Sequence, residues 1–520
     1  MAGGVASPYM GAGPISHQGA VLNRKILRSL SLAALALTLA IAPAMAQRGR
    51  DAPPAERAAG PGVLSLLPAD SVTEHVLDID SGKLAYTATA GTLSLFDQSG
   101  ERSAAIFYTA YALKNAPPNR PVTFVFNGGP GAASAYLHLG VVGPQVIQFA
   151  PGPDGAAPKL ADNPDTWLKF TDLVIIDPVG TGWSRTPKID DANKFWSANT
   201  DAQSLAKAIA LYVTRNGRTG SPKYLLGESY GGYRAIKVAR ALQQDQGTIV
   251  NGIVMLSPYL DGQLGNGRTA LSAALQFPSL VAAELDRRGA FTEGALAGAE
   301  RFALTDYLTT LAGKPPEGDA ARAFYARVAE MTGLPVETVA RVRGFVRDAF
   351  DKRMRDGRSE VVSPYDASMS LADPFPESES AEGSDPVLDG FTRALGGAFS
   401  AYARDQLGFK TEMTYTLLNG EIAHKWDWGD GGRRNASVTR DLRELLGLNP
   451  GFRLMIAHGR DDLVTPYGVT RYILDHIPQI GAPNRTQLKI YKGGHMFYFT
   501  PDMRAAFAAD AAAFYRSEGL

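Results

Sequence analysis

The stretch LLGESYGGY, from Leu225 to Tyr233, places a serine between two glycines directly after a short apolar run. Gly227 and Gly231 stand two residues before and two residues after Ser229. These glycines allow a strand and a helix to approach closely around a sharp turn, which presents the serine at the top of a sheet. A tight turn without chemistry would show the same pattern. The rest of the chain must therefore supply a base, an orienting acid and donors for an oxyanion.

Six short apolar runs predict a parallel sheet around this turn. They read PVTFVF, DLVIID, KYLLG, GIVML, RLMIAH and QLKIYK. Each run is continuous rather than alternating, which is typical of strands buried on both faces. Helical stretches over residues 200–216 and 233–244 separate several of the runs, and this alternation favours a doubly wound α/β fold. Alternating patterns over residues 72–111 predict antiparallel strands and hairpins that precede the parallel part.

The strand pattern stops between residues 261 and 431. Helical patterns prevail there, among them TEGALAGAERFALTDYLTTLAG and PVETVARVRGFVRDAFDKRMRDG. We predict a mainly helical cap insertion over residues 261–431, between core segments at residues 64–260 and 432–520. An independent appended domain is the alternative. The sheet pattern resumes at Arg453, and the strands after it need the strands before it, which favours an insertion.

The N-terminal residues have the pattern of an export signal. Arg24, Lys25 and Arg28 precede the apolar run SLSLAALALTLAIA, and a small-x-small cleavage pattern ends at Ala46. A membrane anchor is the alternative, but the run is short of the roughly 20 apolar residues that a membrane span needs. We therefore predict a cleaved signal peptide over residues 1–46 and no stable membrane anchor. The Pro- and Gly-rich residues 47–63 predict a flexible lead-in.

The composition excludes several classes of function. Lys plus Arg and Asp plus Glu both number 52, so no basic footprint for nucleic acid is present. The absence of cysteine excludes disulfides, thiolate metal sites and a cysteine nucleophile, and it fits a bacterial periplasm or a secreted protein. The sequence contains no H-E-x-x-H metal motif, no phosphate-binding loop and no complete dinucleotide fingerprint. We therefore predict no metal and no cofactor.

The order of a serine, an acid and a histidine selects the partners of Ser229. Of the seven histidines, His495 follows the last predicted strand and a Gly-Gly pair, at the sheet edge where an open α/β fold builds its site. The loop after RLMIAH offers Asp461 and Asp462. We favour Asp462 as the acid that orients the histidine, keep Asp461 as the alternative, and expect the other carboxylate to be solvated.

A glycine-rich loop after the strand at residues 122–126 is the candidate oxyanion hole. It reads NGGPGAAS, and Gly128 and Gly129 would let the backbone turn its amides toward a developing negative charge. The amide of Tyr230, directly after the predicted nucleophile, would be the second donor. A plain glycine turn is the alternative for this loop read alone.

These segments together resemble the serine carboxypeptidases, a branch of the α/β-hydrolase fold. The resemblance rests on NGGPGAAS, IIDPVGTGWS, GESYGGY, GRDDLVTP and GGHM, from about Phe107 to Phe499. It implies Ser229 as nucleophile, Asp462 and His495 as its partners, and the amides of Gly129 and Tyr230 as the oxyanion hole. The helical insertion contributes little to the resemblance.

The resemblance also implies a binding site for the free carboxylate of a peptide. Asn127, Gly128 and Glu228 would bind this end of the substrate, and Trp183 would line the pocket for the residue before the scissile bond. Core packing is the alternative for Trp183. Burial and an incoming carboxylate should raise the pKa of Glu228, so that its protonated form can donate a hydrogen bond.

Two departures from the family pattern bear on selectivity. Ala132 stands where the family usually has cysteine, and Val141 stands where it has a second glutamate that shares in carboxylate recognition. The expected function is an exported serine carboxypeptidase with peptide substrates and with selectivity for the free C-terminus weaker than the family norm. A related aminopeptidase, esterase or acyltransferase is the first alternative, and a catalytically silent binding protein is the second. His usually stands at position 127 in proline-releasing aminopeptidases, and Asn127 argues against that activity.

Overall fold

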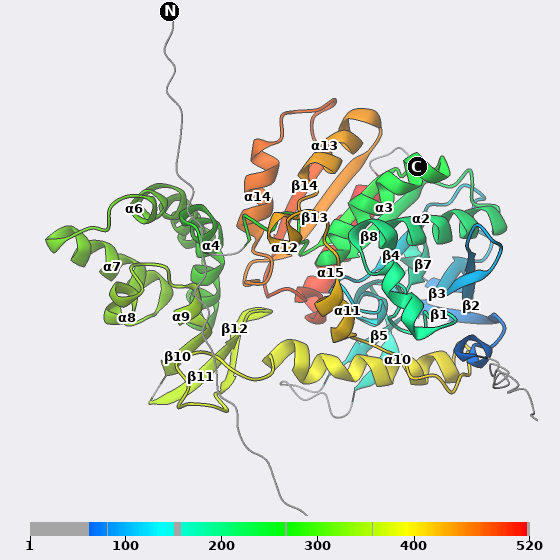
Figure 1. Cartoon of the computed structure of the whole chain (residues 1–520), viewed down its shortest axis with the longest axis horizontal. Coiled ribbons are helices and arrows are strands. Elements are labelled where there is room, and N and C mark those ends of the chain that lie inside the picture. The colour runs from blue at the N-terminus through cyan, green and yellow to red at the C-terminus, as the bar shows by residue number, and fades with distance from the viewer. Residues whose placement is uncertain (1–61, 81, 150–157, 266–267, 356, 517–520) are drawn as a thin grey trace, which may run out of the picture. The chain divides into compact units, whose positions relative to one another are not determined.

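The computed structural model describes residues 62–80, 82–149, 158–265, 268–355 and 357–516 (Figure 1). The predicted signal peptide at residues 1–46 and nearly all of the predicted lead-in at residues 47–63 lie outside the described residues. In the part of the chain that the structure describes, the membrane-span criteria of length and apolar character are met by none of the helices.

The central element is a nine-stranded sheet within the described residues. The pairs among its first four strands are antiparallel, and all later pairs are parallel. This agrees with the predicted hairpins and with all six predicted parallel strands. In sheet order the strands are β1 (Ser71–Ile79), β2 (Gly82–Phe96), β3 (Arg102–Leu113), β7 (Asp172–Ile176), β4 (Val122–Phe126), β8 (Lys223–Glu228), β9 (Gly252–Leu256), β13 (Arg453–Gly459) and β14 (Thr486–Tyr491).

Helices cover both faces of this sheet, because the central strands are buried on both sides. Along β4, Phe124 and Phe126 belong to one hydrophobic cluster and Val125 to the other. One cluster contains residues from α2 (Ala198–Arg215), α3 (Tyr230–Gln246), α13 (Thr439–Leu448) and α14 (Tyr467–His476). The other contains residues from α1 (Ala135–Leu137), α10 (Ala394–Asp405) and α15 (Pro501–Arg516). The strand order and the two covered faces are those of the α/β-hydrolase fold, as predicted.

The strand order also fixes where a site can form. β4 lies between β7 and β8, although β7 follows β4 in the chain. The connections therefore leave β4 and β8 toward opposite faces, and a crevice opens beyond their carboxyl ends. The loops after β4, β8, β13 and β14 meet there, and they carry the residues that the sequence singled out.

The insertion between β9 and β13 is mainly helical. It begins with α4 (Ala270–Arg287), and its helices α4 to α9 gather around a separate hydrophobic cluster (Figure 1). The other helices are α5 (Glu293–Phe302), a π-helical segment (Ala303–Tyr307), α6 (Leu308–Ala312), α7 (Gly318–Thr332), α8 (Val336–Arg341), α9 (Arg347–Asp351), a second π-helical segment (Pro386–Gly390), α10 and α11 (Gly420–Lys425). The short α12 (Gly432–Asn435) follows the insertion.

One predicted helical run in the insertion is wrong. The segment PVETVARVRGFVRDAFDKRMRDG forms α8 and α9, and then the first strand of a three-stranded antiparallel sheet. Arg343 and Gly344 have positive φ angles of 52° and 83°, which no helix continues through. The strands are β10 (Lys352–Arg355), β11 (Arg358–Ser363) and β12 (Asp366–Ala372).

Candidate active site

Ser229 lies on the sharp turn between β8 and α3. Its φ of 60° and ψ of −125° are a conformation that a residue with a side chain rarely adopts. A Cβ atom on Gly227 would lie 2.0 Å from the carbonyl oxygen of Gly231, and one on Gly231 would lie 2.7 Å from the carbonyl oxygen of Phe126. The two glycines are therefore needed for the close approach that the sequence predicted, and the turn presents Ser229 to the crevice.

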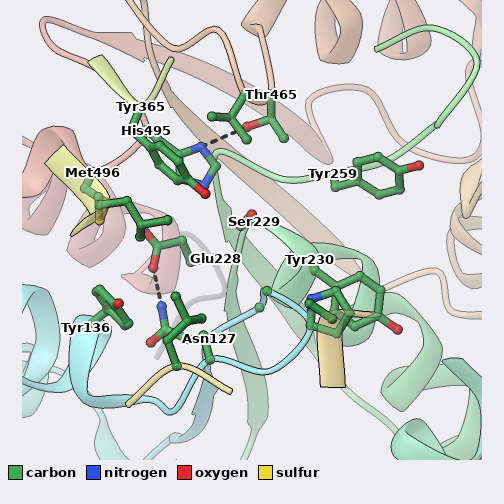
Figure 2. A pocket seen from close by; sticks show the side chains of 18 of the residues that line it. Asn127, Tyr136, Glu228, Ser229, Tyr230, Tyr259, Tyr365, Thr465, His495 and Met496 are labelled. Atoms are coloured by element: carbon green, nitrogen blue, oxygen red, sulfur yellow. Dashed lines mark hydrogen bonds between the residues drawn. The ribbon is translucent and has the colours of Figure 1, made fainter. Parts of the chain in front are cut away.

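The structure brings Asp462 and His495 together from the loops after β13 and β14. Nδ1 of His495 lies 2.8 Å from Oδ2 of Asp462. The other carboxylate oxygen accepts the backbone amides of Val464 and Thr465 at 2.8 and 3.0 Å, and the Thr465 hydroxyl donates to Oδ2 at 2.8 Å. His495 and Ser229 line the same cavity (Figure 2). This arrangement can hold the imidazole with its second nitrogen toward the crevice.

Electrostatics favour an ionised Asp462 beside a basic His495. Burial alone would raise the pKa of Asp462, but the charge of His495 and the hydrogen bonds from His495 and Thr465 outweigh burial and hold that pKa below its usual value. Burial alone would lower the pKa of His495, but Asp462 and Glu228 outweigh it and raise the pKa above its usual value. His495 is thus suited to accept a proton from a neighbouring hydroxyl.

The expectation that the second carboxylate would be solvated is wrong. Asp461 is fully buried, and its Oδ2 accepts the amide of Gly493 at 3.2 Å. Burial and the nearby Asp366 and Asp286 raise its pKa well above the usual value. Asp461 thus holds the loop before His495 through the Gly493 amide, whereas Asp462 contacts the histidine itself.

A loop of the insertion also contacts the loop that carries His495. The amide of His495 donates to the carbonyl of Tyr365 at 2.6 Å, and the amide of Gly494 donates to Oδ2 of Asp366 at 3.1 Å. The Tyr365 ring stands perpendicular to the His495 ring, with centroids 5.4 Å apart. We call residues 363–367, which join the end of β11 to the start of β12, the hairpin loop. No sequence motif marks this loop, because its contacts to the His495 segment join residues far apart in the chain.

The candidate oxyanion hole lies against the turn that carries Ser229. We call this turn, residues 227–231, the nucleophile elbow. A Cβ atom on Gly128 would lie 2.6 Å from the amide nitrogens of both Tyr230 and Gly231, so only glycine lets the two loops meet. Gly129 has a φ of 98°, which turns its peptide in a way that favours glycine. Gly128, Gly129 and Tyr230 all line the cavity beside Ser229.

Glu228 and Asn127 form a buried polar pair at one end of the cavity. Nδ2 of Asn127 donates to Oε2 of Glu228, and the Tyr498 hydroxyl donates to Oε1 at 2.7 Å. Burial raises the pKa of Glu228 to about 7, which is the direction expected from the sequence, although His495, Tyr498 and Asn127 each act to lower it. Tyr498 was not among the predicted residues, because its position three residues after His495 carries no recognisable signal.

The segment around Val141 contributes no carboxyl group to the cavity, and the Tyr498 hydroxyl contacts Glu228 instead. The Val141 side chain is buried in the hydrophobic core and does not line the cavity. The Tyr498 ring packs against the neighbouring Gly140, where a Cβ atom would lie 2.7 Å from the ring. Glu228 therefore receives a neutral hydroxyl donor and has no carboxyl partner from this segment.

The structure places Trp183 away from the cavity, so its predicted role as a pocket wall is wrong. Its indole nitrogen donates to the carbonyl of Met413 at 2.9 Å, and its ring packs edge-on or tilted against Phe107, Phe409 and Tyr415. Trp183 is core packing, the alternative that the sequence left open. Its apolar surroundings account for this position, because the indole buries a large surface and finds one polar partner.

The cavity around Ser229 has a volume of about 270 Å³. Glu228, Asn127 and Tyr136 lie on one side of Ser229, and Tyr259 lies on the opposite side (Figure 2). Tyr365 and Trp428 add further aromatic surface to its wall. The cavity thus has one buried polar end and one aromatic end, with Ser229 between them.

Comparison with known proteins points to one family for the core. Residues 85–277 match the model of the serine carboxypeptidase family. Over 165 residues the chain is 28% identical to serine carboxypeptidase-like 44 of Arabidopsis thaliana, covering 30% of this chain and 31% of that protein. Over 198 residues it is 27% identical to the pheromone-processing carboxypeptidase kex1 of Neosartorya fischeri, covering 36% of this chain and 28% of that protein.

These matches each span about a third or less of the relative's own length. Among solved structures, a proline iminopeptidase of Mycobacterium smegmatis is similar with a TM-score of 0.36 and 16% identity, over 82% of this chain and 98% of that one. The family match over residues 85–277 includes the Gly-rich loop after β4 and the nucleophile elbow. By these matches, residues 85–277 are similar to the serine carboxypeptidase family, and the chain has the α/β-hydrolase fold.

Proposed function

We propose that this protein is an exported serine carboxypeptidase that releases residues from the C-termini of peptides through Ser229, His495 and Asp462. One observation carries the proposal. Glu228 and Asn127 form a buried polar pair in the same cavity as Ser229 and His495, at one end of it. A peptide terminus bound there would place its last peptide bond at the serine.

The first half of the reaction forms an acyl-enzyme. His495 takes the proton of the Ser229 hydroxyl while Oγ of Ser229 attacks the carbonyl carbon of the last peptide bond. Asp462 holds the imidazole by its 2.8 Å contact and stabilises the imidazolium. The amides of Gly129 and Tyr230 stabilise the negative oxygen of the tetrahedral intermediate. His495 then donates its proton to the leaving amine, and the C–N bond breaks.

The second half returns the enzyme to its first state. A water molecule loses a proton to His495 and attacks the ester carbonyl of the acyl-enzyme. The second tetrahedral intermediate breaks the bond to Ser229 Oγ, which recovers its proton from His495. The products are a shortened peptide with a new carboxylate and one free amino acid.

Glu228 would recognise the terminal carboxylate in its protonated form. Because its pKa is raised to about 7, a large part of the population carries a proton at neutral or lower pH and can donate to the substrate. Asn127 would share in this contact. Above this pH two carboxylates would face each other in a buried site and repel.

Val141 favours a second candidate function, a serine hydrolase with relaxed selectivity for the C-terminus. A single carboxyl group at the polar end of the cavity would discriminate less between a free acid and a neutral amide or ester. An esterase, aminopeptidase or acyltransferase activity falls within this alternative.

Mass spectrometry of matched peptides tests the proposal. Purified protein should shorten a free-acid peptide and its N-acetylated form from the C-terminus, and should act more slowly on the C-terminally amidated form. The Ser229→Ala variant is the control for contaminating peptidases. Equal cleavage of the acid and the amide would favour the relaxed hydrolase, and loss of residues from the N-terminus would contradict a carboxypeptidase.

A further inference from the structure

A second cavity adjoins the aromatic end of the first. Its volume is about 310 Å³. Tyr259, Arg433, Val464 and Thr465 line both cavities, so the two share a wall. The second cavity is bounded by the segment after β9 and by the segment before α13. The proposed chemistry at Ser229 does not use it.

The second cavity lies on the side of a substrate that precedes the scissile bond. Glu228 and Tyr259 lie on opposite sides of Ser229 (Figure 2). A peptide whose last carboxylate is at Glu228 and whose last peptide bond is at Ser229 must continue toward Tyr259. An extended chain advances at most about 3.3–3.6 Å per residue. The residue that forms the acyl-enzyme then fills the first cavity, and the residues before it reach the second.

Two arginines give the second cavity a positive wall. The guanidinium of Arg433 lies over the rings of Tyr259 and Trp428, 5.6 and 5.7 Å from their centroids, and Arg434 lines the cavity next to it. Within the described ranges, no carboxylate oxygen lies within 4 Å of a guanidinium nitrogen of Arg433 or Arg434, so neither arginine forms an ion pair. Their charges are therefore available to a bound molecule.

The backbone that carries these arginines is held in place. The Tyr259 hydroxyl donates to the carbonyl of Arg433 at 2.6 Å. A Cβ atom on Gly262 would lie 2.2 Å from the same carbonyl oxygen, so the two segments meet as closely as glycine permits. Asp261, the acidic group of this wall, accepts the amides of Gln263 and Leu264 at 2.9 and 3.1 Å. Its Oδ1 atom is thus occupied by its own turn.

We propose that this second cavity is a substrate subsite that binds an acidic side chain at the second or third residue before the scissile bond. The inference rests on the proposed function, because that function sets the direction of the peptide. Arg433 borders both cavities and would meet the second residue, and Arg434 would meet the third. The aromatic rings under Arg433 hold its exposed guanidinium at the cavity.

The test compares N-acylated peptides that differ only at the second residue before the scissile bond, which is Glu, Gln or Lys. The measured quantity is the ratio of kcat/KM for the Glu peptide to that for the Gln peptide. We expect a ratio of about five for the unmodified protein, as for an exposed but well-placed ion pair, and a ratio near one for Arg433→Gln. The charge reversal Arg433→Glu should make the Lys peptide the preferred one.

Two controls separate this inference from the proposed function. Arg322→Gln removes an exposed arginine of α7, which does not line either cavity, and should leave the ratio unchanged. Binding of the same peptides to Ser229→Ala, measured by calorimetry, reports the subsite without turnover. If the three peptides are hydrolysed with equal kcat/KM and bind with equal affinity, the subsite is overturned and the carboxypeptidase proposal stands. Tighter binding of the Glu peptide without hydrolysis by the unmodified protein supports the subsite and removes the carboxypeptidase.

Discussion

The sheet and the insertion reach the same cavity by different means. The sheet delivers side chains that would react, since Ser229, Asp462 and His495 each follow the end of a parallel strand. The insertion contributes support, because the hairpin loop accepts the amide of His495 and packs Tyr365 against its ring. The difference separates two kinds of dependence. Changes at the strand ends should remove the chemistry, and changes in the insertion should displace groups that remain chemically intact.

The largest effect is expected at the elbow. Ser229→Ala should lower kcat by about a million-fold, and His495→Ala should do the same, because nucleophile and base act as a unit. The double variant should lose little more than either single one. Steady-state kinetics on one peptide, with circular dichroism to check the fold, measure these effects. Near-normal turnover by Ser229→Ala would refute the assignment of the nucleophile.

Substitutions of the two neighbouring carboxylates, Asp462 and Asp461, should lower kcat to very different extents. Asp462→Asn should lower kcat on the order of 10⁴-fold by favouring the wrong imidazole tautomer. Asp461→Asn should cost far less, because Asp461 does not contact the histidine and its surroundings raise its pKa, which favours the neutral form that the amide resembles. The comparison needs only kcat for both variants at one pH. A reversed order would make Asp461 the partner of His495.

A smaller effect is expected from the hairpin loop. Asp366→Ala removes the acceptor of the Gly494 amide, and a buried amide without a partner costs about 1–3 kcal/mol. If about half of this cost appears as displacement of His495, kcat falls roughly two- to tenfold with little change in KM.

Asp366→Asn is the matched control, because burial raises the pKa of Asp366 and the amide keeps an acceptor oxygen. This variant should retain most of the activity. A loss of thermal stability in Asp366→Ala without any change in kcat would show that the hairpin loop supports the fold alone.

The smallest effect concerns pH. Catalysis requires neutral His495, whose pKa is raised, so activity should fall as pH decreases through that pKa. Binding of a free acid requires protonated Glu228, so kcat/KM for free-acid peptides should also fall as pH rises through about 7. Glu228→Gln keeps a neutral donor at every pH and should flatten the alkaline fall by a few-fold. Identical profiles for acid and amidated peptides in both proteins would leave Glu228 as a structural residue of the elbow.

The sequence predicted the sheet well because its signals are local. Each parallel strand is a continuous apolar run, and the elbow needs Gly227 because a Cβ atom there would meet the carbonyl oxygen of Gly231, four residues later. The positions of Asp462 and His495 follow from the same strands, since a residue directly after a parallel strand must lie at the sheet edge.

The remaining features depend on contacts between distant segments. Asp461 looked solvated because its neighbours in sequence are polar, yet Asp366 and Gly493 enclose it from other loops. The position of Trp183 in the core could not be predicted for the same reason, since its partners Phe409 and Tyr415 belong to the insertion. The three-stranded sheet was missed because the segment containing β10 is charged and reads as a continuation of a helix.

The hydrogen bond between His495 and Tyr365 bears on how this protein can be altered by recombination. The insertion cannot be exchanged for that of a relative as a freestanding module, because a backbone amide of the candidate base depends on it. A Cβ atom on Gly494 would lie 2.0 Å from the Tyr365 carbonyl oxygen, so loop and histidine segment fit only as a pair. A chimaera that keeps residues 363–367 with their own residues 493–495 should fold around an ordered histidine. One that crosses over between them should not.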